Sequence, residues 1–590
     1  MVSSPPNLPP DLDPPHALPM ALAAVALPCL IAFNLPPSAT FLNQAAAFIG
    51  WGAWLAVLGA TLPSPRVAGN RPLGLLLAAL GVMVLATVAG SAWRGLPWTL
   101  SVSVAGAIAA AGVTASVGAA VLRAGRGPAV FGALCGALVV AGCASAAIGT
   151  IQVVAPEWTG GDFIAASAVE GRAVGNLRQP NHLATLLLWC IVASVWLGST
   201  RRWPRPLTTA AAIFMLLGLV LTASRTGMVG VAMLALWGVV DRRNARSSRV
   251  LLCLMPVLYG LFWIAASQVG GGEAGAFHGD QQLHRSDISG SRFGIWTNTL
   301  SLIAAHPWVG VGAGDFNFAW TLTPFARRPT AFFDHTHNLP LQLAVELGLP
   351  LAALTLALLA YALWSAFKAV RDADETSGFL RPAFVMVLMI AVHSQLEYPL
   401  WYAYFLLPTA FAWGLCLGTP PKAGSVAAAA NRDSSRPVGT RPLLVAAMLM
   451  TIGGLYAVID YWKVVVIFAP PEHAPPLSQR ILEGRKSLFF GHHADYAAAT
   501  SVPEPGNVMP AFKTATHFLL DTRLMMAWAQ AFASHGDLDR ARHLAARLRE
   551  FENPASNEFF APCDAPADPA APKPFQCQPP SKVMDYRDFR

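Results

Sequence analysis

The sequence predicts an all-α membrane protein that crosses the bilayer many times. Of its 590 residues, 54% are hydrophobic and only 12% are charged, whereas soluble proteins carry about 25% charged residues. Several almost uncharged runs approach the length of about 20 residues that a helix needs to cross the hydrocarbon core. The net charge of +8 lies in short loops between these runs, so it does not indicate nucleic-acid binding.

About thirteen runs are candidate spans, and polar or basic residues separate them. They are 18–34, 41–61, 73–92, 99–121, 128–154, 182–199, 207–223, 226–240, 250–269, 338–366, 382–398, 400–418 and 443–466. The two segments in each of the stretches 207–240 and 382–418 have very short connections.

The basic residues fall in alternate loops, and this pattern predicts the orientation. Cytoplasmic loops are enriched in Lys and Arg. All these loops can be cytoplasmic together only if the N-terminus is inside; their basic residues are Arg66, Arg71, Arg123, Arg126, Arg201, Arg202, Arg205, Arg242, Arg243, Arg246, Arg249, Lys368, Arg371, Arg381, Lys422, Arg432, Arg436 and Arg441. No Lys or Arg precedes Arg66, so we expect no cleavable signal peptide.

This orientation predicts a cytoplasmic tail at 1–17, a transmembrane domain at 18–466 and an outer helical region at 467–590. Within the transmembrane domain, 155–181 and 270–337 are outer loops, and long loops in compact proteins are usually functional. The outer region contains "DTRLMMAWAQAFASHGDLDRARHLAARLREF", which predicts two amphipathic helices joined at "HGDLD". They resemble a tetratricopeptide-type unit that could bind an acceptor protein; ordinary packing against the membrane domain is the alternative.

Two of the eight cysteines, Cys563 and Cys577, lie in the polar segment "PCDAPADPAAPKPFQCQPP". An outer compartment is oxidising, so we expect a structural disulfide between them. The alternative is two unpaired thiols in a disordered Pro/Ala segment. The remaining six cysteines lie in or beside apolar spans, where free Cys behaves as a small hydrophobe.

Polar residues with no obvious structural task gather at the predicted outer edge. In "GNLRQPNHLA", Asn181 can cap the following span, which leaves Arg178 and Gln179 unexplained. In "LTASRTGMVG", Arg225 lies between two apolar runs, against the positive-inside bias. Such charges mark a pathway or site, or they snorkel to the interface.

The long outer loop contains "SRFGIWTNTLSLIAAHPWVGVGAGDFNF". Its apolar residues recur at helical spacing over 291–305, which predicts an amphipathic helix on the membrane surface with Arg292 at its start. The glycines before Asp315 do not form a Walker loop, because no Gly-Lys-Ser/Thr follows. Asp315 is either a cation ligand or a turn residue.

The segment "DHTHN" ends this loop. Asn338 is a good helix cap. Asp334, His335 and His337 could hold a metal, but two histidines without a clear third ligand make a weak site. One histidine could instead act as a base near neutral pH.

A further polar cluster lies in "AVHSQLEYPLWYAYFLLP", at the junction of two spans. Tyrosines are common anchors at membrane interfaces, whereas Glu397 at this depth is less easily explained. Arginines suit a pyrophosphate because guanidinium groups bind phosphate oxygens bidentately. Together with a histidine base, they predict transfer of a glycan from a lipid pyrophosphate to an alcohol.

The motifs above and their order resemble the bacterial O-antigen ligase and polysaccharide polymerase superfamily, and most closely its pilin-type protein O-oligosaccharyltransferases. The resemblance covers roughly 150–420 and, more loosely, the C-terminal region. It implies a GT-C-like glycosyltransferase of the inner membrane with its active site in the periplasm. It also implies no cofactor and no required metal.

The resemblance assigns roles to individual residues. His337 matches the catalytic histidine, and Arg225 and Arg292 match the arginines that bind the donor pyrophosphate, with Arg178 as a third candidate. Other positions implicated in activity match Gln179 and either Tyr398 or Tyr402, of which we favour Tyr398. His335, Glu397 and Asp315 are further candidates with no assigned role.

The implied partners are an undecaprenyl-pyrophosphate-linked oligosaccharide, a periplasmic acceptor protein such as pilin, and the bilayer. Two alternatives stay open. One is an O-antigen ligase acting on lipid A-core, or a polysaccharide polymerase, of the same superfamily. The other is a transporter of the lipid-linked glycan, although such a protein needs a site near the midplane that opens to both faces.

Overall fold

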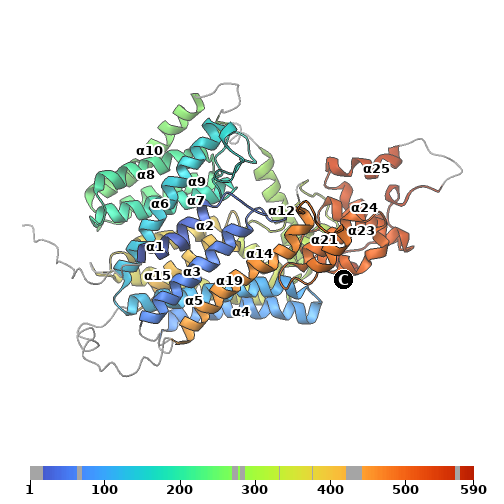
Figure 1. The fold of residues 1–590 in the computed structure, drawn as a ribbon, viewed down its shortest axis with the longest axis horizontal. Helices are drawn as coiled ribbons and strands as arrows, with labels where there is room; N and C mark the ends of the chain where they lie inside the picture. Colours follow the sequence, from blue (N-terminus) through green and yellow to red (C-terminus); the bar gives the residue numbers. More distant parts are fainter. Residues whose placement is uncertain are drawn as a thin grey trace, which may run out of the picture.

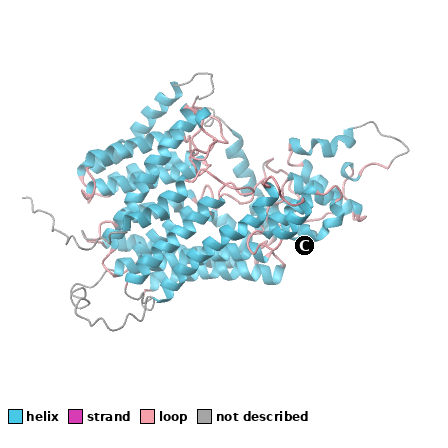
Figure 2. Cartoon of the chain, in the orientation of Figure 1, coloured by secondary structure: helices cyan, strands magenta, loops and turns pink. Residues whose placement is uncertain are grey.

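The computed structural model describes residues 17–62, 70–268, 277–279, 286–330, 332–374, 377–419, 441–564 and 572–590. Residues 1–16 of the predicted N-terminal tail and parts of the 270–337 loop lie outside these ranges. So do four of the basic residues behind the predicted orientation: Arg66, Lys422, Arg432 and Arg436. The described residues form helices and loops, with no strand among them (Figure 2).

Eight of the described helices are long and apolar enough to cross a membrane, which supports the prediction of a polytopic membrane protein. They are α3 (Phe41–Thr61), α4 (Arg71–Arg94), α5 (Trp98–Arg123), α6 (Gly127–Val154), α7 (Pro180–Ser199), α10 (Arg246–Gln268), α15 (Leu349–Asp372) and α19 (Arg441–Phe468).

Five shorter apolar stretches occupy the other predicted span positions. The first, Ala17–Leu30, consists of α1 (Ala17–Ala21), η2 (Leu22–Ala26) and α2 (Leu27–Leu30); the others are α8 (Arg205–Leu221), α9 (Arg225–Val240), α16 (Leu380–His393) and α17 (Ala403–Leu417). Their length alone does not mark them as spans. The total of thirteen therefore stays a prediction.

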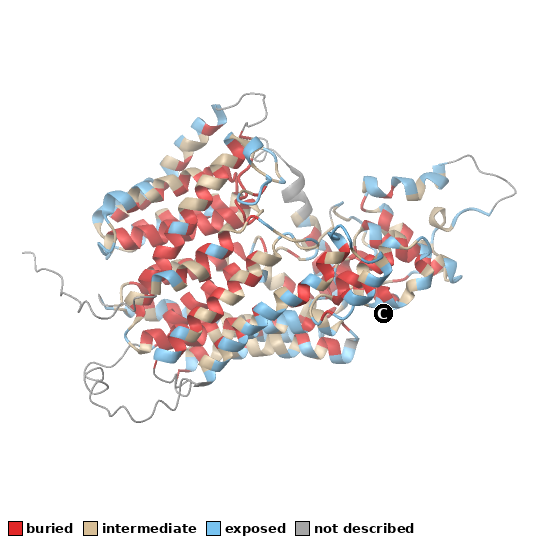
Figure 3. Cartoon of the chain, in the orientation of Figure 1, coloured by how far each residue is buried: buried red, intermediate tan, exposed pale blue. Residues whose placement is uncertain are grey.

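The helices pack into one bundle with α7 at its centre (Figures 1 and 3). Nearly all residues of α7 are buried, and it packs against α6, α8 and α9. Helices α10, α15 and α19 instead expose many apolar side chains, as expected for surfaces that face lipid. The α5–α17 contact depends on Gly414, since a Cβ there would lie 2.0 Å from the carbonyl oxygen of Ala115. Small residues permit such close approach between membrane helices.

The long loop contains α12 (Ser286–Ala305) and α13 (Phe316–Leu322), and α14 (Leu339–Leu347) follows it. The predicted span 338–366 is therefore not one helix, because Gly348, with φ +78°, separates α14 from α15. Helix α12 covers the range predicted for an amphipathic helix and begins five residues earlier, at Ser286 rather than at 291. Phe293 and Leu300 are exposed on it, but Ile295 and Leu302 are buried in a core shared with the C-terminal region. The helix is therefore packed on one side by protein.

The C-terminal region is helical and lies at one end of the molecule, beside α12 (Figure 1). Its elements are α20 (Leu477–Gly484), α21 (Gly491–Ser501), η5 (Pro505–Val508), α22 (Met509–Ala515), α23 (Thr522–Ser534), α24 (Leu538–Arg549), η6 (Pro554–Ser556), α25 (Asn557–Asp564), η7 (Phe575–Cys577) and η8 (Tyr586–Phe589). The predicted helix pair is present as α23 and α24, which pack together. Asp521 and Asp537 cap the two helices.

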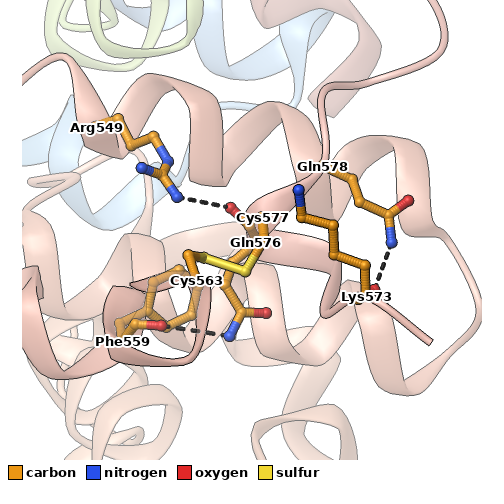
Figure 4. Close-up of a disulfide and its surroundings, with 7 residues drawn as sticks. All are labelled: Arg549, Phe559, Cys563, Lys573, Gln576, Cys577 and Gln578. Atoms are coloured by element: carbon orange, nitrogen blue, oxygen red, sulfur yellow. Dashed lines mark hydrogen bonds between the residues drawn. A yellow bond between two sulfur atoms is a disulfide. The ribbon is translucent and has the colours of Figure 1, made fainter. Parts of the chain in front are cut away.

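The structure joins Cys563 and Cys577 in a disulfide that connects α25 to η7 (Figure 4). Gln576 lies beside it and donates from Nε2 to the carbonyl oxygen of Phe559, 3.3 Å away. Arg549 of α24 donates to the carbonyl of Gln576 at 3.4 Å. The bridge thus ties η7 to α25, and the hydrogen bond from Arg549 ties η7 to α24.

Candidate active site

The candidate site is centred on a buried carboxylate in the turn between α16 and η4 (Pro399–Trp401). Helix α16 ends at His393 rather than at the predicted 398, and residues 394–397 form turns that are hydrogen-bonded back to its last residues. The turn brings Glu397 inward, where it is 5% exposed.

Three segments far apart in the sequence donate hydrogen bonds to Glu397. His337 Nδ1 lies 2.8 Å from Oε2, and Asn181 Nδ2 lies 3.0 Å from Oε1. Arg292, near the start of α12, forms an ion pair with the same carboxylate. A carboxylate can accept four hydrogen bonds, so one group organises all three donors.

The charge of Glu397 follows from these contacts. Burial alone raises its pKa, but the hydrogen bond and charge of His337 and the charge of Arg292 outweigh that effect and lower the pKa from 4.5 to about 2. An ionised carboxylate can only accept, so His337 Nδ1 must carry the proton of this hydrogen bond. In the neutral imidazole, Nε2 then holds the lone pair.

His337 is held by its neighbour in the chain, Thr336, which is fully buried. Thr336 donates its N–H to Gln342 Oε1 at 2.8 Å, and its carbonyl accepts from Trp296 Nε1 at 2.9 Å. His337 itself has φ +55°, in the left-handed region that non-glycine residues seldom adopt. The loop is thus fixed from α14 on one side and α12 on the other.

The start of α14 is bonded directly to the turn that contains Glu397. Asn338 caps α14 as predicted, accepting from Leu341 N at 3.0 Å. The N–H of Leu339 donates to the carbonyl of Ser394 at 2.8 Å, and Asn338 Nδ2 donates to the carbonyl of Gln395 at 3.0 Å. These bonds explain why His337 and Glu397, 60 residues apart, meet.

Arg225 is the first residue of α9 and is half-buried. The preceding residue, Ser224, caps the helix by accepting from Gly227 N at 3.0 Å. Its hydroxyl also donates to Asn181 Oδ1 at 2.6 Å. The segment that contains Arg225 is therefore linked to Glu397 through Asn181.

The "RQPN" segment differs from the sequence prediction. Gln179, and not Asn181, caps α7: its Oε1 accepts from His182 N at 2.7 Å. The reason is that Pro180 occupies the first helical position, which makes the extended residue before it the cap. Arg178 Nη2 donates to the carbonyl of Ala32 at 2.5 Å. Both residues thus have structural contacts, and their roles in activity stay predictions.

Aromatic rings line the cluster beside His337. Tyr398 stacks on His335, with ring centroids 4.4 Å apart, and lies edge-on to His337 at 4.9 Å. Burial raises the pKa of Tyr398, so its phenol stays protonated and can donate. Tyr402 instead contacts the ring of His182 at 4.4 Å. Of the two tyrosines, Tyr398 is the one in contact with His337.

Asp315 lies outside this cluster. It is buried, and it pairs with His517 of the C-terminal region at 2.6 Å and with Arg590 at 2.5 Å. These partners occupy its carboxylate, so the prediction that it could bind a cation is not supported. Across the described residues, no three His, Cys, Asp or Glu side chains come together as a metal site would require.

Sequence reasoning missed three polar residues that position the site: Ser224, Gln342 and, in its true contact, Asn181. A helix cap is an ordinary local explanation for Asn181, and no motif singled out Ser224 or Gln342. The available signal was position, since Asn181 follows Gln179 by two residues and Ser224 directly precedes Arg225.

Three family models match parts of the chain. The model described as O-antigen ligase matches residues 210–356, which include Arg225, Arg292 and His337. The resemblance to the O-antigen ligase superfamily is confirmed. A model for the C-terminal part of a virulence factor membrane-bound polymerase matches 383–559, and one for a protein glycosylation ligase matches 173–197.

Two curated relatives come from Acinetobacter baylyi. A general O-oligosaccharyltransferase is 26% identical over 260 residues, covering 42% of this chain and 44% of the relative. A ComP-specific O-oligosaccharyltransferase is 25% identical over 264 residues, covering 43% of this chain and 45% of the relative. The aligned region thus spans less than half the length of each relative.

Proposed function

We propose that this protein transfers a preassembled oligosaccharide from undecaprenyl pyrophosphate to Ser or Thr hydroxyls of periplasmic proteins. The observation that supports this most is the convergence of His337, Arg292 and Asn181 on the buried Glu397. The proposed reaction needs a base with an oriented lone pair beside a cation, and this cluster supports both roles.

In the proposed reaction, His337 Nε2 removes the proton from the acceptor hydroxyl. The hydroxyl oxygen attacks the sugar carbon that is bonded to the pyrophosphate, and a new glycosidic bond forms. The carbon–oxygen bond to the pyrophosphate breaks, and undecaprenyl pyrophosphate leaves with the electron pair. General base catalysis of this kind typically contributes 10²–10⁴-fold to a rate.

The arginines would stabilise the charge that develops on the leaving group. Arg292 has five N–H donors, so its ion pair with Glu397 leaves donors for phosphate oxygens. Arg225 and Arg178 are the further candidates for this binding. The Tyr398 phenol lies next to His337 and is hydrogen-bonded to Tyr402, and His335 stacks on its ring. We expect Tyr398 to line the site for the lipid-linked donor.

Two observations favour a protein acceptor. The protein glycosylation ligase model matches the segment that includes Arg178, Gln179 and Asn181. Both curated relatives are named O-oligosaccharyltransferases. The site would lie on the periplasmic side of the inner membrane, following the orientation that the basic residues predict, with 467–590 on the same side. No cofactor or metal has a part in the proposed steps.

A reconstituted transfer assay tests the proposal. The protein in lipid nanodiscs is mixed with undecaprenyl-pyrophosphate oligosaccharide and a pilin-type acceptor, and the acceptor mass is measured. We expect an increase equal to one intact glycan. Transfer that persists when His337 and Arg292 are both replaced by Ala would contradict the mechanism.

The same assay separates the transporter alternative. In cells that contain the His337→Ala variant, we expect lipid-linked donor to accumulate on the periplasmic face. A donor trapped on the cytoplasmic face would support a transporter instead.

Glycan polymerisation is the second candidate, because residues 383–559 match a membrane-bound polymerase model. The chemistry would be the same, with a sugar hydroxyl of another lipid-linked glycan as acceptor. Omitting the acceptor protein from the assay distinguishes polymerisation from protein glycosylation. A ladder of elongated lipid-linked products would favour the polymerase, and unchanged donor would favour the protein acceptor.

A further inference from the structure

One hydrogen-bonded chain runs through the site, and its middle member has no assigned role. Ser224 donates to Asn181 Oδ1 at 2.6 Å, Asn181 Nδ2 donates to Glu397 Oε1 at 3.0 Å, and Glu397 Oε2 accepts from His337 at 2.8 Å. The chain connects three helices that are distant in sequence, α7, α9 and α14, with the turn after α16.

The orientation of the Asn181 amide follows from its partners. Glu397 is ionised and can only accept, so the NH₂ group must face it. The oxygen then faces Ser224, whose hydroxyl has a proton to donate while its lone pair accepts from Gly227 N at 3.0 Å. Every polar atom of this link is satisfied in one arrangement only.

The ordinary explanation for Asn181 does not apply. An asparagine at a helix start usually serves as the N-cap, but Gln179 caps α7. The side chain of Asn181 is therefore committed to contacts outside its own helix, with Ser224 and Glu397.

We propose that Asn181 is a positioning residue. It holds the Glu397 carboxylate in the orientation that accepts the hydrogen bond from His337, and it links this carboxylate to the start of α9, where Arg225 lies. This inference rests on the proposed function, since it assigns Asn181 a part in the same transfer reaction. Asn181 acts through Glu397 and need not touch either substrate.

The physical effect is twofold. The amide fixes one carboxylate oxygen, so the other points at His337 Nδ1 and keeps Nε2 directed away from Glu397. The donated hydrogen bond also disperses the negative charge of Glu397. The charged and titratable groups around this carboxylate and the base are His337, Arg292, His393, His182, Tyr398, Tyr402 and Asp334. A change at Asn181 therefore alters the field at the base.

Two variants test the role. Asn181→Leu keeps the approximate volume and removes the donor, and Asn181→Asp keeps the shape and adds a negative charge. We expect Asn181→Leu to lower kcat about tenfold, with the KM for lipid-linked donor changed less than about twofold. Both variants leave the negative charge of the Glu397 carboxylate less compensated, so we expect the acid limb of the pH–rate profile to move to higher pH. For Asn181→Asp we expect a movement of about one pH unit.

The matched control is Asn176, a buried asparagine in the same segment. Its Nδ2 donates to the carbonyls of Leu30 and Phe163 at 2.7 and 2.9 Å, away from the site. We expect Asn176→Ala to lower the thermal unfolding midpoint and to leave the acid limb in place. Ser224→Ala removes the other end of the link and should move the acid limb in the same direction as Asn181→Leu.

The outcomes are distinguishable. The inference is wrong if Asn181→Leu and Asn181→Asp keep the wild-type pH–rate profile. This holds if kcat is unchanged, and also if kcat falls only together with the unfolding midpoint, as expected for Asn176→Ala. A His337→Ala variant that still transfers glycan would instead reject the proposed base, and with it this inference. An inactive His337→Ala variant beside unaltered Asn181 variants would reject the positioning role alone.

Discussion

His337 shows how a single residue can be placed by contacts that local sequence does not reveal. Its backbone lies in the left-handed region, and its side chain is oriented by a carboxylate 60 residues away. His335, two residues earlier, instead stacks on Tyr398, and its Nδ1 lies 3.1 Å from Asp334 Oδ1. The two histidines of "DHTHN" therefore differ in their partners.

Replacing His337 by Gln tests the base directly. The Gln amide can still donate to Glu397, but it has no basic nitrogen, so we expect the transfer rate to fall by about 10²–10⁴-fold. The control is His473→Gln, an exposed position in the C-terminal region. Glycan transfer by the His337→Gln variant within tenfold of wild type, measured by acceptor mass, would exclude general base catalysis by this residue.

Glu397→Gln tests the buried charge through stability and pH. The folded-state pKa of about 2 lies below the ordinary 4.5, so the carboxylate stabilises the fold fully above pH 4.5. This contribution, of the order of 3 kcal/mol, is lost as the pH falls from 4.5 towards 2. We expect Glu397→Gln to lower the unfolding midpoint at pH 7 and to approach the wild type at pH 3.

The exposed Glu472 provides the control for this measurement. The Glu472→Gln variant should unfold like the wild type at both pH values. An equal difference between wild type and Glu397→Gln at pH 7 and pH 3 would show that the carboxylate charge is not the source of the stability.

At the scale of elements, hydropathy and cap residues predicted most of the helices. The apolar runs predicted the helix positions, because a helix that crosses the lipid core needs a run of consecutive apolar residues. The helix pair in the C-terminal region also followed from local periodicity. Helix ends were less accurate: α16 ends at His393, and the turns that follow bury Glu397 although the flanking residues are apolar.

The contacts of the site could not be predicted in the same way. Arg292, His337 and Glu397 were all noticed individually, but their meeting depends on how α12, α14 and α16 pack. Asn181 was assigned to the nearest local task, capping, because the sequence gives no sign of its partners in α9 and the distant turn.

The contact between α12 and the histidine loop leads to a prediction about an element. Trp296 Nε1 donates to the carbonyl of Thr336, and Trp296→Phe removes this donor while keeping an aromatic ring. Leaving a buried carbonyl unsatisfied costs about 1–3 kcal/mol, and we expect kcat to fall about tenfold. Trp413→Phe is the control, since its buried Nε1 has no partner among the described residues. Equal turnover in the two variants would contradict the role of α12.

At the scale of the molecule, the C-terminal region and the long loop share one hydrophobic core. Hydrogen bonds and an ion pair join the same two parts of the molecule. Leu520 N donates to Asn317 Oδ1 at 2.8 Å, His543 Nε2 donates to the carbonyl of Leu322 at 2.8 Å, and Arg328 Nε pairs with Glu550 at 2.8 Å. The region is thus docked against the loop that leads to His337.

Asp315→Asn tests this docking. Asp315 is buried and paired with His517 and Arg590, and breaking a buried ion pair costs about 3–5 kcal/mol. We expect faster cleavage of the C-terminal region in limited proteolysis. Asp372→Asn, which breaks the exposed pair with Arg371, should change the cleavage rate little, because exposed pairs contribute about 0–1 kcal/mol. Identical cleavage of the two variants would argue against docking through Asp315.

The shared core has a consequence for exchanging parts between relatives. A chimera joined near residue 467 would combine a foreign C-terminal region with the native residues 315–328, and so separate Asn317, Leu322 and Arg328 from the groups they bind. The unit that can be transplanted is discontinuous: it joins the segment before "DHTHN" to the helices after α19. A hybrid that keeps these contacts should therefore replace both segments together.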